Sequence, residues 1–227
     1  MRPLRQRWTA LASILALTAL AACGSPSDGS TEDGSAAEES SRSSLDNVES
    51  FYGEYEDYTS VIAAIQAGDI SAEDLEYPFV AQQEHVDAAS GWNGKPPFYE
   101  MSPPVGGNHL SVWQTCTGSV YEAPIADGNA VHSLEHGAVW LTYDPELVDQ
   151  AHVDALSLLI NGRDYSLMSP YPGQGVPVSL QSWGNRYQTD DPADPAIEEY
   201  LDTYILNELF NPEINATCSG GNEATTP

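Results

Sequence analysis

In Val131-His132-Ser133-Leu134-Glu135-His136-Gly137, two histidines and a glutamate fall within five residues of a chain that has five histidines in all. The same His-x-x-Glu-His spacing binds zinc on a helix of the inverted zinc peptidases. The next residues, Ala138-Val139-Trp140-Leu141-Thr142-Tyr143, are rich in aromatic and branched side chains and predict a β-strand. A strand directly after Gly137 argues against that class of protease, although the side chains themselves suit a metal site.

Backbone geometry limits how this stretch can bind an ion. Along an extended strand, residues four apart are separated by about 13 Å, too far for two imidazoles to share one ion at bond lengths of about 2.0–2.1 Å. On a helix the corresponding Cβ atoms are about 5–6 Å apart, which is close enough. His132 and His136 can therefore share a metal only if residues 133–137 curl through a turn; otherwise only one of them binds.

The N-terminal residues predict export and lipidation. Arg2, Arg5 and Arg7 precede an apolar run, residues 11–20, that is too short to span a membrane and is typical of a signal peptide. Leu20-Ala21-Ala22-Cys23 resembles a bacterial lipobox, which predicts a signal peptide over residues 1–22 and a diacylglycerol on Cys23. An ordinary secretory signal that contains a cysteine is the alternative. We expect a protein anchored by lipid to the extracytoplasmic face of the cell membrane.

Composition after the signal peptide separates a tether from a folded part. Residues 23–44 hold the predicted lipidated cysteine and a polar, acidic segment that is too hydrophilic to pack. Residues 45–227 are long enough for a single globular domain. Of the 7 basic residues, 3 lie in the signal peptide, leaving 4 against 34 acidic ones, which excludes nucleic acid as a partner. The acidity serves solubility or concentrates cations, and no protein partner can be read from it.

Two cysteines remain after Cys23. In an exported domain Cys116 and Cys218 predict a disulfide that links the middle of the chain to its C-terminal part. The alternative interpretation makes Cys116 a thiolate metal ligand, because it lies near His109 in the sequence.

The pattern along the rest of the chain predicts a small α+β domain with a short mixed or antiparallel sheet, three to four helices and Pro/Gly-rich loops. We expect strands near residues 85–86, 118–121, 138–143, 165–168 and 176–180, and helices over 58–66, from 71, over 145–160 and over 192–210. The helix over 145–160 is predicted to bury Leu147, Ala151, Ala155, Leu158 and Leu159. A Pro/Gly-rich loop covers 91–108.

Several segments together resemble a bacterial family of unknown function, DUF3105. They are Pro103-Pro104-Val105-Gly106-Gly107-Asn108-His109, Trp113 with Cys116, the 131–143 stretch, and Ser169-Pro170-Tyr171-Pro172. The resemblance covers roughly residues 85–218. The family usually has Pro-Thr-Ser-Gly-Pro-His where this chain has Pro-Val-Gly-Gly-Asn-His, so His109 matches while its loop differs. The resemblance implies no activity, and chemistry must be inferred from the residues.

The candidate metal ligands are the four histidines in the resembling segments, together with two methionines and a glutamate. His152 lies in a predicted amphipathic helix and is expected at the surface. Imidazole with thioether, outside the cytoplasm, suits copper, whereas imidazole with carboxylate alone suits zinc. The structural alternative is that these histidines hydrogen-bond loops while methionine fills the core. The candidates are His85, His109, His132, His136, Met168, Met101 and Glu135.

Glu135 admits four roles in this scheme. It is a metal ligand, an acceptor that fixes a histidine tautomer, a general base acting on metal-bound water, or the partner of Arg163 or Arg186 in a buried salt bridge.

Three hypotheses of different classes follow. The leading one is a lipid-anchored protein that binds copper through His109, His132 and His136, with Met168 or His85 completing the site, for capture or delivery rather than turnover. Histidine nitrogens more than about 6 Å apart would exclude it. The second is a metal-dependent hydrolase with Glu135 as base, which needs an open coordination position. The third is a non-catalytic interaction module with structural histidines and an aromatic groove lined by Trp92, Trp113, Trp140 and Trp183.

Overall fold

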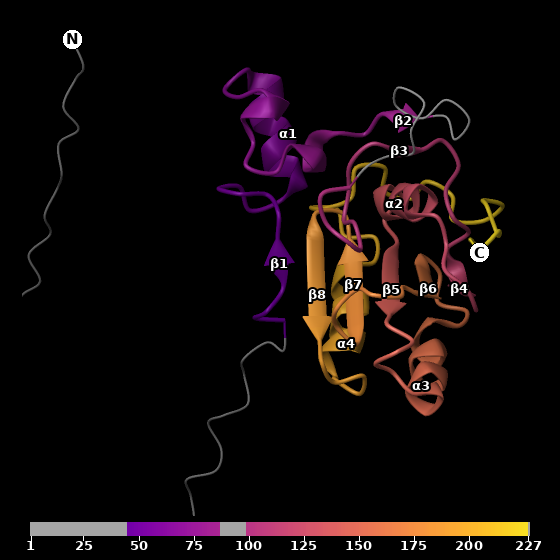
Figure 1. Cartoon of the computed structure of the whole chain (residues 1–227). Coiled ribbons are helices and arrows are strands. Elements are labelled where there is room, and N and C mark those ends of the chain that lie inside the picture. The colour runs from indigo at the N-terminus through magenta and orange to yellow at the C-terminus, as the bar shows by residue number, and fades with distance from the viewer. Residues whose placement is uncertain (1–44, 87–98, 227) are drawn as a thin grey trace, which may run out of the picture. The chain divides into compact units, whose positions relative to one another are not determined.

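The computed structural model describes residues 45–86 and 99–226 (Figure 1). Its main sheet has six strands in the order β1-β8-β7-β5-β6-β4, and a second sheet has two, β2 and β3. The strands are β1 (Glu49–Ser50), β2 (His85–Val86), β3 (His109–Leu110), β4 (Thr117–Val120), β5 (Val139–Tyr143), β6 (Ser166–Pro170), β7 (Val178–Ser182) and β8 (Asn185–Thr189). The helices in these ranges are α1 (Tyr58–Ala67), α2 (Asp127–Glu135), α3 (Gln150–Ile160) and α4 (Ala196–Tyr204), with short 3₁₀ turns at Ala72–Asp74 and Pro78–Ala81.

The main sheet is mixed. Strand β6 pairs in parallel with both β4 and β5, whereas β7 pairs antiparallel with β5 and with β8, and β8 pairs antiparallel with β1. Helices and a mixed sheet in one domain confirm the predicted α+β class.

Alternation along β5 divides the core into two layers. Val139, Leu141 and Tyr143 belong to the apolar cluster that includes Leu156 of α3 and residues of α4. Trp140, between them, belongs to the other cluster, which α2 joins through Ala130, Val131 and Leu134. Because successive strand residues point to opposite faces, α2 packs on the face of the sheet opposite to α3 and α4.

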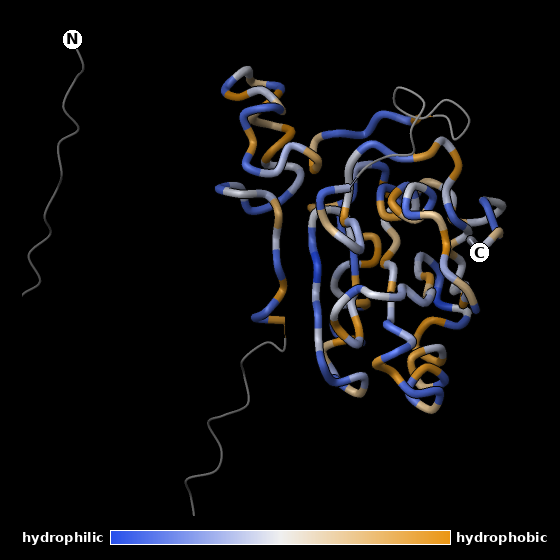
Figure 2. The backbone as a smooth tube through the Cα atoms, viewed as in Figure 1, coloured by the Kyte–Doolittle hydropathy of each residue, from blue (hydrophilic) through white to orange (hydrophobic). Residues whose placement is uncertain are grey.

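The sequence predicted the apolar strands more successfully than the polar ones. The expected strands at 85–86, 118–121, 138–143, 165–168 and 176–180 match β2, β4, β5, β6 and β7 closely. Strand β8 was not predicted, because Asn185-Arg186-Tyr187-Gln188-Thr189 has no apolar alternation, and Figure 2 shows β8 as hydrophilic along its length. Its partners, β7 and β1, hold it in the sheet.

The predicted buried stripe of α3 was wrong for most of its residues: Leu159 does pack against the core, but Ala151 and Ala155 are exposed. The helix begins at Gln150 behind the N-cap Asp149, so Leu147 lies in the preceding turn and is 54% exposed, and Leu158 is 77% exposed. The buried residues are instead Leu156 and Ile160, one turn apart. The last helix is likewise shorter than predicted, since it ends at Tyr204 shortly before Leu206 adopts a positive φ of 52°.

A disulfide joins Cys116 to Cys218 across 102 residues, as predicted. Cys116 is therefore not a thiolate ligand. It ties the C-terminal segment to the stretch that precedes β4, where Cys116 N–H also donates to the Cys218 carbonyl.

The predictions for the N-terminal part, namely the signal peptide over 1–22 and the lipidated Cys23 with its tether to residue 44, lie outside the described residues. So do Trp92 and the first part, residues 91–98, of the predicted 91–108 loop. Among the helices that the structure describes, none is both long and apolar enough to cross a membrane.

Candidate metal centre

Three elements that are distant in the sequence meet at the histidines. Strands β2 and β3 pair in parallel with His85 opposite His109. Helix α2 lies against β3 and brings His132 and Glu135, which are three residues apart and so lie on neighbouring positions of one helix face. Close approach depends on Gly128, because a Cβ there would lie 2.7 Å from Cγ of Leu110.

The donor atoms of His85, His109, His132 and Glu135 all lie within 4.8 Å of one another. Nε2 of His109 is 2.9 Å from Oε2 of Glu135, and Nε2 of His85 is 3.6 Å from the same oxygen. The ring centroids of the three histidines are 4.6–4.9 Å apart. These separations fall inside the limit of about 6 Å beyond which histidines cannot share an ion. We call this group the inner site.

Backbone carbonyls fix the protonation of the buried rings. Nδ1 of His109 is 2.8 Å from the Gly107 carbonyl oxygen, and Nδ1 of His132 is 2.7 Å from the Leu110 carbonyl oxygen. A carbonyl only accepts, so each Nδ1 carries the hydrogen and donates it. In a neutral ring the other nitrogen, Nε2, then holds a lone pair, which is the form that binds metals.

Two buried atoms of the inner site have no hydrogen-bond partner among the described residues. They are Nε2 of His109, whose ring is fully buried, and Oε2 of Glu135, whose side chain is 2% exposed. They lie 2.9 Å apart but are not aligned for a hydrogen bond. Buried polar atoms normally have partners, and a cation between these two atoms, either a proton on His109 or a metal ion, would provide one.

The electrostatics keep the site in its metal-binding form. Burial raises the pKa of the Glu135 carboxyl, but the polar contact with His109 and the positive charges that His109, His132 and His85 carry when protonated outweigh burial and hold that pKa below its ordinary value. The pKa of His132 is lowered to about 4, chiefly by burial, against the opposing effect of its hydrogen bond to Leu110. A charged carboxylate beside a neutral imidazole is the state that accepts a metal ion.

His136 lies beside the inner site rather than within it. It is the C-cap residue of α2, its ring centroid is 4.6 Å from that of His132, and its Nδ1 donates to the Thr217 carbonyl at 2.8 Å. Burial lowers the pKa of His136. Its Nε2 is 3.9 Å from Oε2 of Glu213. Helix α2 and its C-cap form the turn that the sequence analysis required. This turn brings the rings of His132 and His136 into contact, but only His132 belongs to the inner site.

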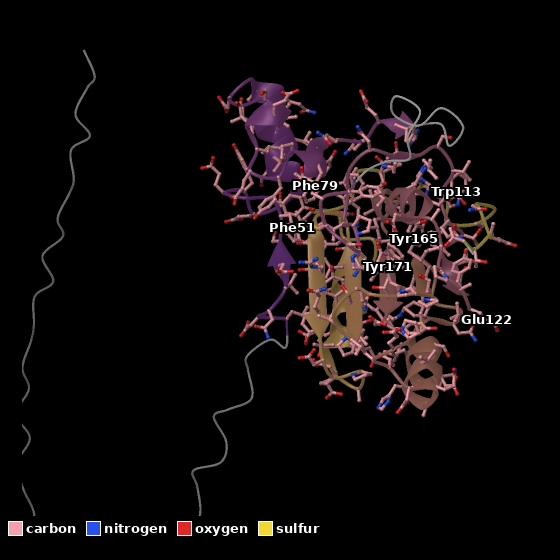
Figure 3. The ribbon with its side chains drawn as sticks, viewed as in Figure 1. Phe51, Phe79, Trp113, Glu122, Tyr165 and Tyr171 are labelled. Atoms are coloured by element: carbon pink, nitrogen blue, oxygen red, sulfur yellow. A yellow bond between two sulfur atoms is a disulfide. The ribbon has the colours of Figure 1, made fainter. Side chains whose placement is uncertain are left out.

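The structure leaves Met168 out of the site. It is fully buried on β6, in the apolar cluster that packs against α3 and α4, whereas the site-bearing α2 packs with the other cluster. Met101 packs against a third apolar cluster, as does Phe79, which Figure 3 labels. Met168 was expected, as an alternative to His85, to complete the site, because sequence alone cannot distinguish a thioether in the core from one that binds a metal.

The arginines also lie elsewhere. Arg163 pairs with Asp202 and Arg186 with Glu49, each at 2.7 Å, so the interpretation of Glu135 as the partner of one of these arginines was wrong. His152 is at the surface as expected, with its Nδ1 2.8 Å from Asp149. Trp140 and Trp183 are fully buried core residues, and Trp113 lies beside α2 (Figure 3).

A family model described as a protein of unknown function, DUF3105, matches residues 93–220. The chain belongs to the DUF3105 family. The matched segment holds His109, His132, Glu135 and His136, whereas His85 precedes it. Comparisons with curated proteins and with solved structures gave no match. In this DUF3105 chain, the function must therefore be argued from the site itself.

Proposed function

We propose that this DUF3105 protein holds one divalent transition-metal ion at the inner site, through Nε2 of His85, His109 and His132 and a carboxylate oxygen of Glu135. The observation that carries the proposal is the buried, unpartnered pair of His109 and Glu135, 2.9 Å apart, with the Nδ1 of His109 already committed to a carbonyl. Fixing the far nitrogen of a ligating histidine is how proteins orient such rings toward a metal.

The donor set favours zinc over the copper that the sequence suggested. Three imidazoles and a carboxylate are ligands that zinc takes in tetrahedral sites. The thioether of Met168, which was the reason for favouring copper, is in the core. Cu(II) also binds imidazole and ranks above zinc in general affinity, so it is the competitor to be measured.

Capture or delivery fits the site better than hydrolysis. Four protein donors complete a tetrahedral sphere, whereas a hydrolytic metal needs an open position for water. For Glu135 to act as a base it would have to leave the ion, yet its Oε2 is the atom that lies closest to His109. The gathering of the histidines also removes the ground for treating them as scattered structural residues.

The cellular setting remains the one proposed from the sequence, a lipid anchor at Cys23 that holds the domain at the extracytoplasmic face of the membrane. The Cys116–Cys218 disulfide supports it, because disulfides persist in oxidising compartments.

Metal titration of the purified full-length protein in detergent tests the inner site. Zn(II), Cu(II) and Cu(I) are each added while heat and bound metal are measured. The informative variant is His109→Asn, because an asparagine amide nitrogen can take the place of Nδ1 and keep the bond to Gly107 while Nε2 is removed. His152→Asn, at an exposed position, is the matched control.

We expect one tight equivalent of Zn(II) that is lost in His109→Asn and kept in His152→Asn, with unchanged circular dichroism in both. Tight binding that survives His109→Asn, or no tight binding of any ion by the wild type, would disprove the proposed function.

A further inference from the structure

His136 and Glu213 form a pair that the inner site does not use. Nε2 of His136 and Oε2 of Glu213 are 3.9 Å apart, beyond hydrogen-bond distance. Two ligand atoms on opposite sides of one ion, at bond lengths near 2.0–2.1 Å, are at most about 4 Å apart. The separation is therefore one that a single transition-metal ion can bridge, and Glu213, at 53% exposure, is free to shorten it by a small rotation.

The imidazole of this pair is buried and prepared for binding. The side chain of His136 is 4% exposed, and its Nδ1 donates to the Thr217 carbonyl. Because Nδ1 carries the hydrogen, Nε2 of the neutral ring holds a lone pair, and the Glu213 carboxylate lies 3.9 Å from it.

The backbone and an aromatic ring hold the pair in place. Glu213 N–H donates to the carbonyl of Glu135, 2.9 Å away, which fixes Glu213 at the C-terminal end of α2. The Trp113 ring packs against both His132 and His136, with centroids 5.8 and 5.2 Å away. Trp113 thus contacts both rings and helps to fix their positions.

We infer that His136 and Glu213 hold a second divalent transition-metal ion, with water completing its coordination, at a position we call the outer site. It offers two protein ligands where the inner site offers four, and a second cation close to the first is repelled, so it binds more weakly. The ring of His132 lies between His136 and the other two histidines, since ring contacts join His136 only to His132 and Trp113 among the described residues. In this scheme the outer site is a neighbouring position that an ion occupies on its way to or from the inner site. This transfer role rests on the proposed function, whereas binding of a second equivalent at the outer site does not.

Binding stoichiometry separates the two sites. Zn(II) and Cu(II) are titrated into the full-length protein, its His136→Asn and Glu213→Gln variants, and His109→Asn. The asparagine preserves a donor toward Thr217 and removes Nε2, and Glu213→Gln keeps the shape of an exposed side chain. Glu208→Gln, another exposed glutamate of the C-terminal part, is the control.

We expect the wild type to bind two equivalents, the second at least tenfold more weakly. His136→Asn and Glu213→Gln should each lose the weak equivalent and keep the tight one within threefold of the wild-type Kd. One equivalent in the wild type that persists in both variants would overturn the outer site while leaving the inner site intact. A weak equivalent that is lost in His136→Asn while no tight one is seen would support the outer site and overturn the proposed function. Two equivalents in every variant would overturn the outer site.

Discussion

At the scale of single residues, a backbone carbonyl decides what each buried imidazole can do. The rings of His109, His132 and His136 each donate from Nδ1 to a carbonyl, of Gly107, Leu110 and Thr217 respectively. A histidine serving only a structural purpose uses both nitrogens or leaves one in water. Here Nε2 of His109 lies 2.9 Å from the Glu135 carboxylate and Nε2 of His136 lies 3.9 Å from the Glu213 carboxylate, and these separations are the grounds for proposing metal ions there.

Replacing Glu135 by glutamine tests its role as a ligand. The amide keeps the size of the side chain but removes the negative charge, so we expect metal affinity to fall by at least about tenfold, since even loss of a partner behind a ligand costs about 10–100-fold. The measurement is a competition titration against a chelator of known affinity. Glu208→Gln should leave the Kd unchanged, and an unchanged Kd in Glu135→Gln would mean that the carboxylate is not a donor.

The residue types of the site could be predicted from the sequence, but their grouping could not. His109 and His132 were expected to bind and do lie together, and His85 was an alternative that β2–β3 pairing brings opposite His109. The sequence did not indicate whether His132 or His136 would lie outside the inner site. The last turn of α2 and the contacts of the C-terminal segment determine that it is His136. Glu213 carried no signal at all among 34 acidic residues.

At the scale of elements, the change from helix to strand at Gly137 positions the site. Gly137 has a φ of +102°, a region that favours glycine, and a Cβ there would lie 2.9 Å from Cδ2 of Leu206. The C-cap of α2, His136, comes directly before it, and β5 begins two residues after it, at Val139. The glycine that argued from sequence against a zinc-peptidase helix is thus the residue that lets a short helix end and a buried strand begin.

Gly137→Ala should lower the free energy of unfolding by about 1–3 kcal/mol, because it adds backbone strain and a contact with Leu206. Gly173→Ala is the matched control, since Gly173 also has a positive φ, of 78°, but nothing within 4 Å of the added Cβ. Urea unfolding followed by circular dichroism measures both. Equal losses in the two variants would show that the backbone conformation alone, without the contact to Leu206, accounts for the effect.

Helix α2 shows why part of the fold could not be predicted. It begins Asp127-Gly128-Asn129, residues with low helix propensity, and it is buried almost throughout because β3 and the C-terminal segment cover it. Its apolar periodicity is weak for the same reason, since a helix surrounded by protein has no solvated face to alternate with. Strands β5 and β6, by contrast, contain apolar residues typical of buried strands, and the sequence analysis predicted both.

Acid should weaken the junction between β8 and α4. Asp194 accepts hydrogen bonds from Tyr187, Thr189 and the Ala196 N–H, at 2.7, 2.9 and 2.9 Å. Burial raises the pKa of Asp194, but these bonds outweigh burial and lower the pKa below its ordinary value. A carboxyl with a lowered pKa stabilises the fold above its unfolded pKa of about 3.9, and the stabilisation is lost as the pH falls through the lowered value.

Asp194→Ala is therefore expected to cost about 1–2 kcal/mol at pH 7 and less at a pH below the lowered pKa. Urea unfolding of wild type and variant at both pH values gives the two differences, with the exposed Asp190→Ala as control. A difference that stays constant with pH would show that the ionised form of Asp194 contributes nothing.

At the scale of the whole molecule, the C-terminal segment that follows α4 connects the inner site to the outer site. Thr217 supplies the carbonyl for His136, and Glu213 N–H bonds to Glu135. The backbone of Asn222 hydrogen-bonds to Trp113 and Thr115. The disulfide next to these bonds joins Cys116 to Cys218. The inner site depends mainly on β2, β3 and α2, whereas the outer site depends on this segment as well.

Removing the disulfide should weaken metal binding at the outer site more than at the inner site. In Cys116→Ala/Cys218→Ala the free energy of unfolding is expected to fall by about 2–5 kcal/mol, given that the bridge closes a loop of 102 residues. Thr217, next to the lost bridge, should hold His136 less firmly, so the weak metal equivalent should be lost or weakened while the tight one stays. Calorimetric titration and urea unfolding of the full-length variant measure both effects. Loss of the tight equivalent before the weak one would show that the C-terminal segment supports the inner site instead.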